Sequence, residues 1–253
     1  MKEGIESIRV RSQKGGIAAM IHHPEGNTEW LAVLCPGYLD PKDYRGIAGL
    51  AEELCSLGYT AVRFDPMGTW DSGGSISDYT MTQCLEDVRS VLGFMLDRTK
   101  YKRILIGGHS KGGTVSILYA ARDPRVSLVL GIMPSLGLGQ HEEWRKAGAR
   151  VSERDLPGDE SKKREFKVPY SYAEDEERYD VVKEVKNVKV PVILVAGELD
   201  TTVPPNDVKR IFDSANEPKM FVVLPGIGHD YRHSDEEVKI VNGKVLELVQ
   251  QFQ

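Results

Sequence analysis

The stretch Ile104-Leu-Ile-Gly-Gly-His-Ser-Lys-Gly-Gly113 decides how the rest of the chain is interpreted. Its apolar start is typical of a buried strand, and residues 114–121 behind it are typical of a helix. Between the two lies a Gly-x-Ser-x-Gly turn formed by Gly108, Ser110 and Gly112. A serine on so sharp a turn takes strained backbone angles, and small neighbours let strand and helix pass closely without Cβ clashes. Strand, turn and helix together predict that Ser110 is a nucleophile raised above the edge of a sheet.

Length and charge narrow the class of protein. The chain has 253 residues, of which 40% are hydrophobic and 28% charged, as in an ordinary globular protein. This length suits one domain, or one domain with a modest insertion. The net charge of −5 argues against a broad electrostatic attraction to nucleic acid or to an anionic membrane.

Targeting and redox signals point to the cytoplasm. The start, Met1-Lys-Glu-Gly-Ile-Glu6, is already charged and does not resemble a signal peptide. No apolar run approaches the roughly 20 residues that span a bilayer. Cys35, Cys55 and Cys84 have no metal-ligand spacing and are expected to be reduced core thiols. We therefore expect a cytoplasmic protein with no membrane span, no nucleic-acid partner and no metal, whose oligomeric state the sequence does not indicate.

Strand patterns alternate with helical patterns over most of the chain. Strands are predicted at 5–10, 17–21, 30–35, 59–64, from 104, and at 126–133, 190–196 and 219–224, and helices at 46–57, 82–98, 114–121, 206–214 and 235–250. The first two strands flank Lys14-Gly-Gly16 and form a predicted hairpin. Such alternation implies a mostly parallel, twisted sheet with helices on both faces.

The segment 134–189 breaks this alternation. It is dense in charge of both signs, has no long apolar run and carries Tyr170, Tyr172 and Tyr179. Because it is too long for a plain connection, we predict an inserted cap, with residues 1–133 and 190–253 forming the core. The alternative is a solvent-exposed surface segment with no role in binding.

A serine nucleophile needs a histidine base, and sites in parallel sheets form beyond the carboxyl ends of the strands. His229 follows the strand 219–224 in a glycine-bearing loop and is the predicted base. His109 is adjacent to Ser110, but neighbours on a sharp turn point apart, so it is expected to be a packed, hydrogen-bonded residue. The remaining histidines are placed elsewhere: His22 and His23 at the end of the hairpin, His141 in the cap, and His233 in the last helix.

The acid that orients the histidine should also follow a strand. The loop after 190–196 offers Glu198 and Asp200, and Asp200 is preferred because it lies farther out on the loop. Glu198 is the alternative. The order Ser110, Asp200, His229 agrees with the order Ser…Asp…His of one hydrolase fold class.

An oxyanion hole requires two backbone N–H donors. The residue after the nucleophile, Lys111, supplies the first, and Tyr38 in the loop Pro36-Gly-Tyr-Leu39 is the predicted second. We expect the Lys111 side chain to reach solvent, where its charge favours anionic substrates or the developing oxyanion. A purely structural turn is the alternative for Pro36-Gly37.

These motifs resemble the α/β-hydrolase superfamily over essentially the full length. Within it, the chain is most similar to small serine esterases of the cinnamoyl/feruloyl type and to monoglyceride-lipase-like enzymes. Residues 63–72 are similar to the pattern Arg-x-Asp-x-x-Gly-x-Gly-x-Ser, except that Trp70 replaces the second glycine. Pro36 stands where the oxyanion segment usually has histidine, so the resemblance implies that Gly37 and Tyr38 keep their role without that histidine's hydrogen bond. In these esterases an insertion at the position of 134–189 forms a lid over the acyl pocket.

The residues and the resemblance predict a cofactor-independent hydrolase of carboxylic esters, including aromatic or short- to medium-chain acyl esters. Thioester hydrolysis, acyl transfer and peptide or amide cleavage on the same triad remain alternatives, because fold alone does not choose between them. A non-catalytic binding protein with this fold is a further alternative. Trp70, Tyr170 and Tyr172 are the candidates for binding the substrate.

Overall fold

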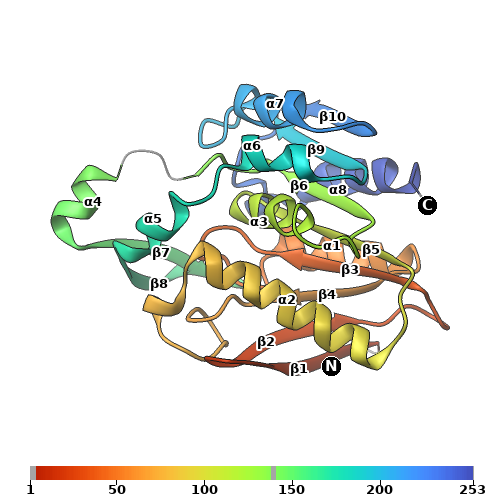
Figure 1. Ribbon diagram of the computed structural model, residues 1–253, viewed down its shortest axis with the longest axis horizontal. Helices are drawn as coiled ribbons and strands as arrows, with labels where there is room; N and C mark the ends of the chain where they lie inside the picture. The colour runs from red at the N-terminus through yellow and green to blue at the C-terminus, as the bar shows by residue number, and fades with distance from the viewer. Residues whose placement is uncertain (1–3, 138–140, 253) are drawn as a thin grey trace.

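The protein, described by a computed structural model over residues 4–137 and 141–252, is built around one eight-stranded sheet (Figure 1). The strand order is β1-β2-β4-β3-β5-β6-β9-β10. β2 runs antiparallel to β1 and to β4, and the other neighbours are parallel, which confirms the predicted hairpin and mostly parallel sheet. The strands are β1 (Ile5–Ser12), β2 (Gly15–His22), β3 (Trp30–Cys35), β4 (Thr60–Phe64), β5 (Arg103–His109), β6 (Leu128–Ile132), β9 (Val192–Gly197) and β10 (Lys219–Leu224).

Helices cover both faces of this sheet (Figure 1). One face is covered by α1 (Arg45–Ser56) and α8 (Asp235–Gln250), which pack against each other. The other face is covered by α2 (Met81–Arg98), α3 (Lys111–Ala120), α6 (Val181–Glu184) and α7 (Pro205–Ser214). Because the central strands are enclosed on both sides, β4, β6 and β9 are buried along their whole length. None of the helices within the described ranges is long and apolar enough to cross a membrane.

Residues 134–189, between β6 and β9, contain a second sheet. Its strands β7 (Ala149–Leu156) and β8 (Asp159–Pro169) pair antiparallel. Beside this hairpin lie the short helices α4 (Glu142–Ala147) and α5 (Ser171–Glu176), at the left of Figure 1, and the 3₁₀ turn η2 (Val185–Asn187) follows α6. The segment packs onto the core through buried apolar side chains, among them Trp144, Phe166, Val168 and Tyr172.

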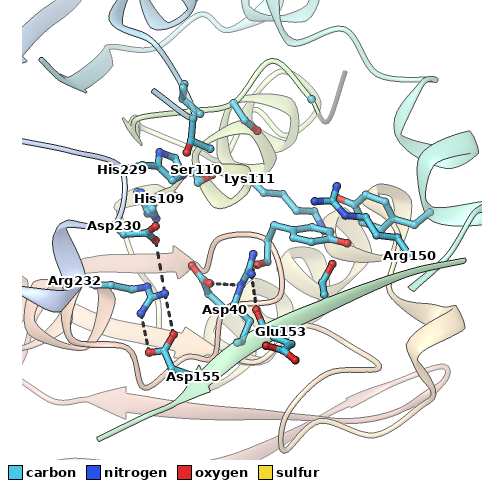
Figure 2. A pocket seen from close by; sticks show the side chains of 18 of the residues that line it. Asp40, His109, Ser110, Lys111, Arg150, Glu153, Asp155, His229, Asp230 and Arg232 are labelled. Atoms are coloured by element: carbon cyan, nitrogen blue, oxygen red, sulfur yellow. Dashed lines mark hydrogen bonds and ion pairs between the residues drawn. The ribbon is translucent and has the colours of Figure 1, made fainter. Parts of the chain in front are cut away.

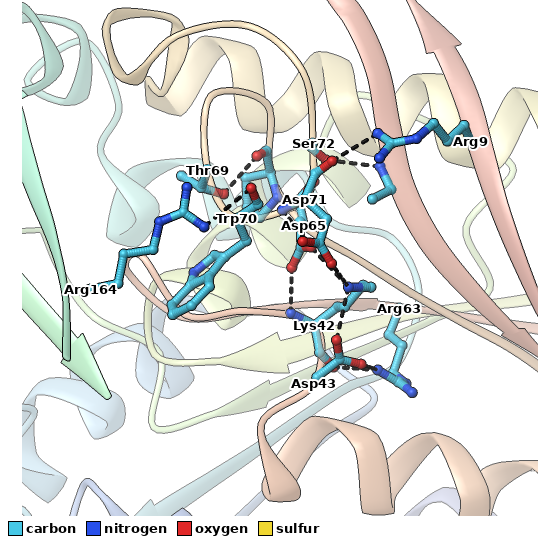
Figure 3. Close-up of polar contacts among 12 residues, drawn as sticks. Arg9, Lys42, Asp43, Arg63, Asp65, Thr69, Trp70, Asp71, Ser72 and Arg164 are labelled. Atoms are coloured by element: carbon cyan, nitrogen blue, oxygen red, sulfur yellow. Dashed lines mark hydrogen bonds and ion pairs between the residues drawn. The ribbon is translucent and has the colours of Figure 1, made fainter. Parts of the chain in front are cut away.

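A buried polar network ties the loop after β3 to the loop after β4 (Figure 3). The Lys42 ammonium contacts the carboxylates of Asp43, Asp65 and Asp71 at 2.8, 3.0 and 2.9 Å, and its side chain is 6% exposed. The backbone N–H of Lys42 also donates to Asp65 Oδ1 at 2.7 Å. Burial opposes the positive charge, but the carboxylates outweigh it and raise the pKa of Lys42 above its usual value.

We expect Lys42→Met to lower the free energy of unfolding by about 3–5 kcal/mol, because the buried carboxylate of Asp65 loses its cation. Urea unfolding followed by tryptophan fluorescence measures the change. Lys102→Met is the matched control, since Lys102 pairs with Glu29 on the surface and such pairs contribute about 0–1 kcal/mol. Equal losses in the two variants would show that the network does not stabilise the fold.

Candidate active site

Ser110 lies on a strained turn between β5 and α3. Its backbone has φ 53° and ψ −122°, a left-handed conformation that is unusual for any residue except glycine. A Cβ atom on Gly108 or Gly112 would lie 2.2 or 2.0 Å from the carbonyl oxygen of Cys35, so both positions require glycine. The turn therefore has the geometry that the Gly-x-Ser-x-Gly motif predicts.

Three loops bring the predicted nucleophile, base and acid together. His229 Nε2 lies 3.0 Å from Ser110 Oγ, and His229 Nδ1 lies 2.7 Å from Asp200 Oδ2. Both are hydrogen-bonding distances, and with Nδ1 protonated the ring donates to Asp200 and accepts from Ser110. The three residues come from the ends of β5, β9 and β10, which meet at the carboxyl edge of the sheet.

Asp200 is held in place by its own loop. Its Oδ1 accepts the backbone N–H groups of Thr202 and Val203 at 2.9 and 2.7 Å, which leaves Oδ2 to face His229. The alternative acid, Glu198, instead accepts the N–H of Gly226 at 2.9 Å and is exposed. The structure thus places Asp200, and not Glu198, against the histidine.

The other histidines lie away from the serine hydroxyl or serve packing. The ring of His109 is buried against His229, with centroids 4.7 Å apart, and meets the edge of Tyr231 at 5.3 Å. Burial, together with the charges of His229 and Arg232, lowers the pKa of His109 well below its usual value. His109 is packed as predicted, but within the described residues its Nε2 has no hydrogen-bond partner. The prediction that His233 lies in the last helix is wrong, because it ends the 3₁₀ turn η3 (Tyr231–His233) before α8 begins.

Ser110 and His229 open into a cavity of about 620 Å³ (Figure 2). Side chains from the 134–189 segment form one wall, including Arg150, Ser152 and Arg154 of β7. Charged residues of both signs line the cavity: Asp40, Glu153, Asp155, Glu176, Asp230, Lys111, Arg150, Arg154, Lys163 and Arg232. Ion pairs join several of these residues. Arg154 contacts Asp40 at 3.2 Å. Arg232 contacts Asp155 at 2.9 Å and Asp230 at 3.6 Å (Figure 2).

Both predicted oxyanion donors belong to residues that line this cavity. Lys111 is the first residue of α3, where a helical N–H has no partner within the helix. Across residues 4–137 and 141–252, neither the Tyr38 N–H nor the Lys111 N–H donates to a protein acceptor. Two unpaired donors on residues that line the same cavity as Ser110 fit the chemistry of an oxyanion hole.

The Lys111 side chain does not reach solvent, and that prediction is wrong. It is 3% exposed, and its ammonium lies 3.7 Å from the ring centroid of Tyr79 and 4.8 Å from that of Tyr172. It also contacts the Sγ atom of Cys84 at 3.0 Å. The aromatic faces attract the buried cation, which is why the side chain turns inward instead of outward.

The structure separates the three candidates for substrate binding. Tyr172 lines the cavity, whereas Trp70 and Tyr170 lie outside its lining. Trp70 turns away because its indole N–H donates to the carbonyl of Leu39 at 2.7 Å and its ring packs on Phe166 at 5.5 Å. The ring of Tyr170 packs against Trp144 at 6.4 Å.

Sequence reasoning missed the arginines at the site. Arg154, Arg150 and Arg232 line the cavity, but in the sequence they stand among many other charged residues. The alternation of Arg150, Ser152 and Arg154 on one side of β7 was the one available signal. Within the described ranges no group of three or more His, Cys, Asp or Glu is arranged to hold a metal ion.

Comparison with known proteins shows the family to which the chain belongs. The family described as serine aminopeptidase, S33, matches residues 26–181. The mouse mitochondrial palmitoyl-protein thioesterase ABHD10 is 29% identical over 212 residues, which cover 81% of this chain and 69% of the mouse protein. An uncharacterised protein of Mycobacterium tuberculosis is 25% identical over 91% of this chain and 72% of its own length.

Solved structures share the fold. Est1E from Butyrivibrio proteoclasticus with bound ferulic acid has a TM-score of 0.79 at 21% identity, over 96% of this chain and 98% of that one. The α/β hydrolase GrgF from Penicillium sp. has a TM-score of 0.80 at 19% identity, over 95% and 96%. These likenesses confirm the predicted α/β-hydrolase fold. The chain therefore belongs to the serine aminopeptidase, S33, family and is a hydrolase with the α/β-hydrolase fold.

Proposed function

We propose that the protein hydrolyses carboxylic esters through an acyl-enzyme formed on Ser110. Ser110 Oγ attacks the ester carbonyl while His229 Nε2 takes its proton, and Asp200 stabilises the resulting imidazolium. The N–H groups of Tyr38 and Lys111 bind the oxyanion. His229 then gives the proton to the departing alkoxide. Water, activated by the same histidine, releases the acid from Ser110.

One observation carries this proposal: the continuous contact from Asp200 through His229 to Ser110 at 2.7 and 3.0 Å, open to the cavity. The unpaired N–H groups of Tyr38 and Lys111 add the site for the oxyanion. A non-catalytic binding protein would have no need to keep Ser110 in a strained conformation. The test is hydrolysis of p-nitrophenyl acetate by the wild-type protein, and its absence across a panel of activated esters would overturn the proposal.

The residues that line the cavity also indicate which acyl groups the site would bind. In an apolar tunnel each added methylene is worth about 0.8 kcal/mol, or roughly fourfold in kcat/KM. Here the walls carry charges of both signs, and the apolar lining includes Val203 and the rings of Tyr38 and Tyr172, whose centroids lie 5.3 Å apart. We therefore propose short or aromatic acyl groups, with the 134–189 segment as the cap that binds them.

With p-nitrophenyl esters of increasing length, we expect kcat/KM to stop rising at about four carbons, because longer chains meet charged side chains and gain little from burial. Initial rates on C2 to C16 esters, measured below the solubility limit of each, give the profile. A benzoyl or cinnamoyl ester tests the two tyrosines. A steady increase through C12 would contradict a polar acyl site.

Thioester hydrolysis on the same triad is the second candidate. It is favoured by the likeness to relatives named palmitoyl-protein thioesterases, at 25–29% identity. Short-chain oxygen esters and thioesters with the same acyl group, compared by kcat/KM, distinguish the two activities.

A further inference from the structure

The two peptide groups that follow Tyr38 are hydrogen-bonded at both ends. In the first, the carbonyl of Tyr38 accepts Nε of Arg154 at 3.0 Å, and the N–H of Leu39 donates to the hydroxyl of Tyr79 at 2.9 Å. In the second, the carbonyl of Leu39 accepts the indole N–H of Trp70 at 2.7 Å, and the N–H of Asp40 donates to the carbonyl of Gly37 at 3.2 Å. Three side chains from three separate segments therefore fix the backbone next to the Tyr38 N–H.

Leu39 needs this support, because its backbone lies in the left-handed region. Its φ is 56°, and its side chain is fully buried. Leucine rarely adopts this conformation, which persists only where the surroundings over-determine it. Without the hydrogen bonds to Trp70 and Tyr79, the peptides around Leu39 would relax and the Tyr38 N–H would change its orientation.

The two side chains are themselves held firmly. Trp70 lies on the loop that Lys42 ties down through Asp65 and Asp71 (Figure 3). Tyr79 is buried and stacks on Tyr172, with centroids 5.3 Å apart and an interplanar angle of 20°.

Tyr79 also touches the second oxyanion donor. The ammonium of Lys111 lies 3.7 Å from the centroid of the Tyr79 ring. The Tyr79 phenol thus contacts both segments that carry the proposed oxyanion donors: its hydroxyl accepts the N–H of Leu39, in the peptide after Tyr38, and its ring binds the Lys111 ammonium.

We propose that Trp70 and Tyr79 are positioning residues of the oxyanion hole, which hold the Tyr38 N–H in line with the Lys111 N–H. The inference rests on the proposed function. It gives Trp70 a role different from the substrate contact that the sequence predicts. A residue that binds substrate raises KM when it is replaced, whereas a residue that aims an oxyanion donor lowers kcat.

The test uses Trp70→Phe and Tyr79→Phe, which keep the aromatic packing and remove the indole N–H or the hydroxyl. Each variant is expected to lose about 10- to 100-fold in kcat with little change in KM, because a misplaced donor loses part of the 100- to 1000-fold that a whole donor supplies. Tyr119→Phe is the control, since its hydroxyl donates to Asp123 outside the cavity lining. Thermal unfolding shows whether each variant is folded. If Tyr79→Phe does not fold, the proposal is tested with Trp70→Phe alone.

Two further readouts separate positioning from a structural role. The inhibition constant of a trifluoromethyl ketone, which forms an oxyanion on serine, should rise in proportion to the loss of kcat/KM, while that of the acid product stays constant. The rate of Ser110 labelling by a fluorophosphonate should also fall in the two variants, and it should fall further in the variant that loses more kcat.

The outcomes distinguish the positioning role from the proposed function. If wild type labels at Ser110 and both variants keep wild-type kcat and labelling rates, the positioning role is overturned and the proposed function stands. If the losses appear in KM instead, Trp70 and Tyr79 act on the substrate and the inference is likewise overturned. If the wild-type protein is not labelled and hydrolyses neither esters nor thioesters, the proposed function and the positioning role are both overturned.

Discussion

Replacing Ser110 with alanine is expected to lower kcat for ester hydrolysis by about 10⁴- to 10⁶-fold, because it removes the hydroxyl that His229 contacts and activates. His229 would keep its contact with Asp200, and the donors at Tyr38 and Lys111 would remain. The residual rate therefore reflects only binding and oxyanion stabilisation. Initial rates with p-nitrophenyl acetate, at enzyme concentrations high enough to detect a slow background, measure the loss.

Ser116→Ala is the matched control for this experiment. It removes a buried hydroxyl from the same helix, where Ser116 donates to the carbonyl of Gly112 at 2.7 Å. We expect this variant to keep its activity. A Ser110→Ala protein that hydrolyses the ester at the wild-type rate would show that the measured activity arises elsewhere.

Asp200→Asn is expected to lower kcat by about 10⁴-fold, because the amide reverses the polarity of the contact with His229. The Thr202 and Val203 N–H groups would hold the amide oxygen and present the amide NH₂ to Nδ1 of the ring. The histidine would then carry its proton on Nε2, facing Ser110, and would not accept the serine proton. The pH dependence and magnitude of kcat on one ester measure this effect.

The adjacent acid provides the control for this variant. Glu198→Gln changes a carboxylate two residues away that contacts the Gly226 N–H and not the histidine. We expect its kcat to match wild type. If Glu198→Gln were the more damaging of the two substitutions, the assignment of the acid would have to move to Glu198.

Local patterns were enough to predict the sheet and the three residues that meet on it. Apolar runs such as 30–35 and 190–196 fill strands that are buried on both faces, and such runs are recognisable without tertiary information. Ser110, Asp200 and His229 each follow a strand, and the carboxyl ends of parallel strands lie at one edge, so their meeting follows from topology.

Contacts between segments that are distant in the sequence could not be predicted from local patterns. The hairpin of β7 and β8 carries exposed charged residues along most of its length, so it lacks the apolar alternation that marks a half-buried strand. Lys111 turns inward because Tyr79 and Tyr172 come from two other elements to form a cage around its ammonium. Trp70 was assigned to the pocket because it replaces a glycine in the motif of residues 63–72, whereas its position depends on a hydrogen bond to the carbonyl of Leu39, 31 residues earlier.

The central claim, that Ser110 is an activated nucleophile, is tested most directly by labelling with a fluorophosphonate followed by intact-protein and peptide mass spectrometry. We predict one adduct per chain, located on Ser110, absent in Ser110→Ala and formed much more slowly in His229→Ala because the base that activates the hydroxyl is lost. Folded wild-type protein that forms no adduct, or forms it on another residue, would contradict the claim.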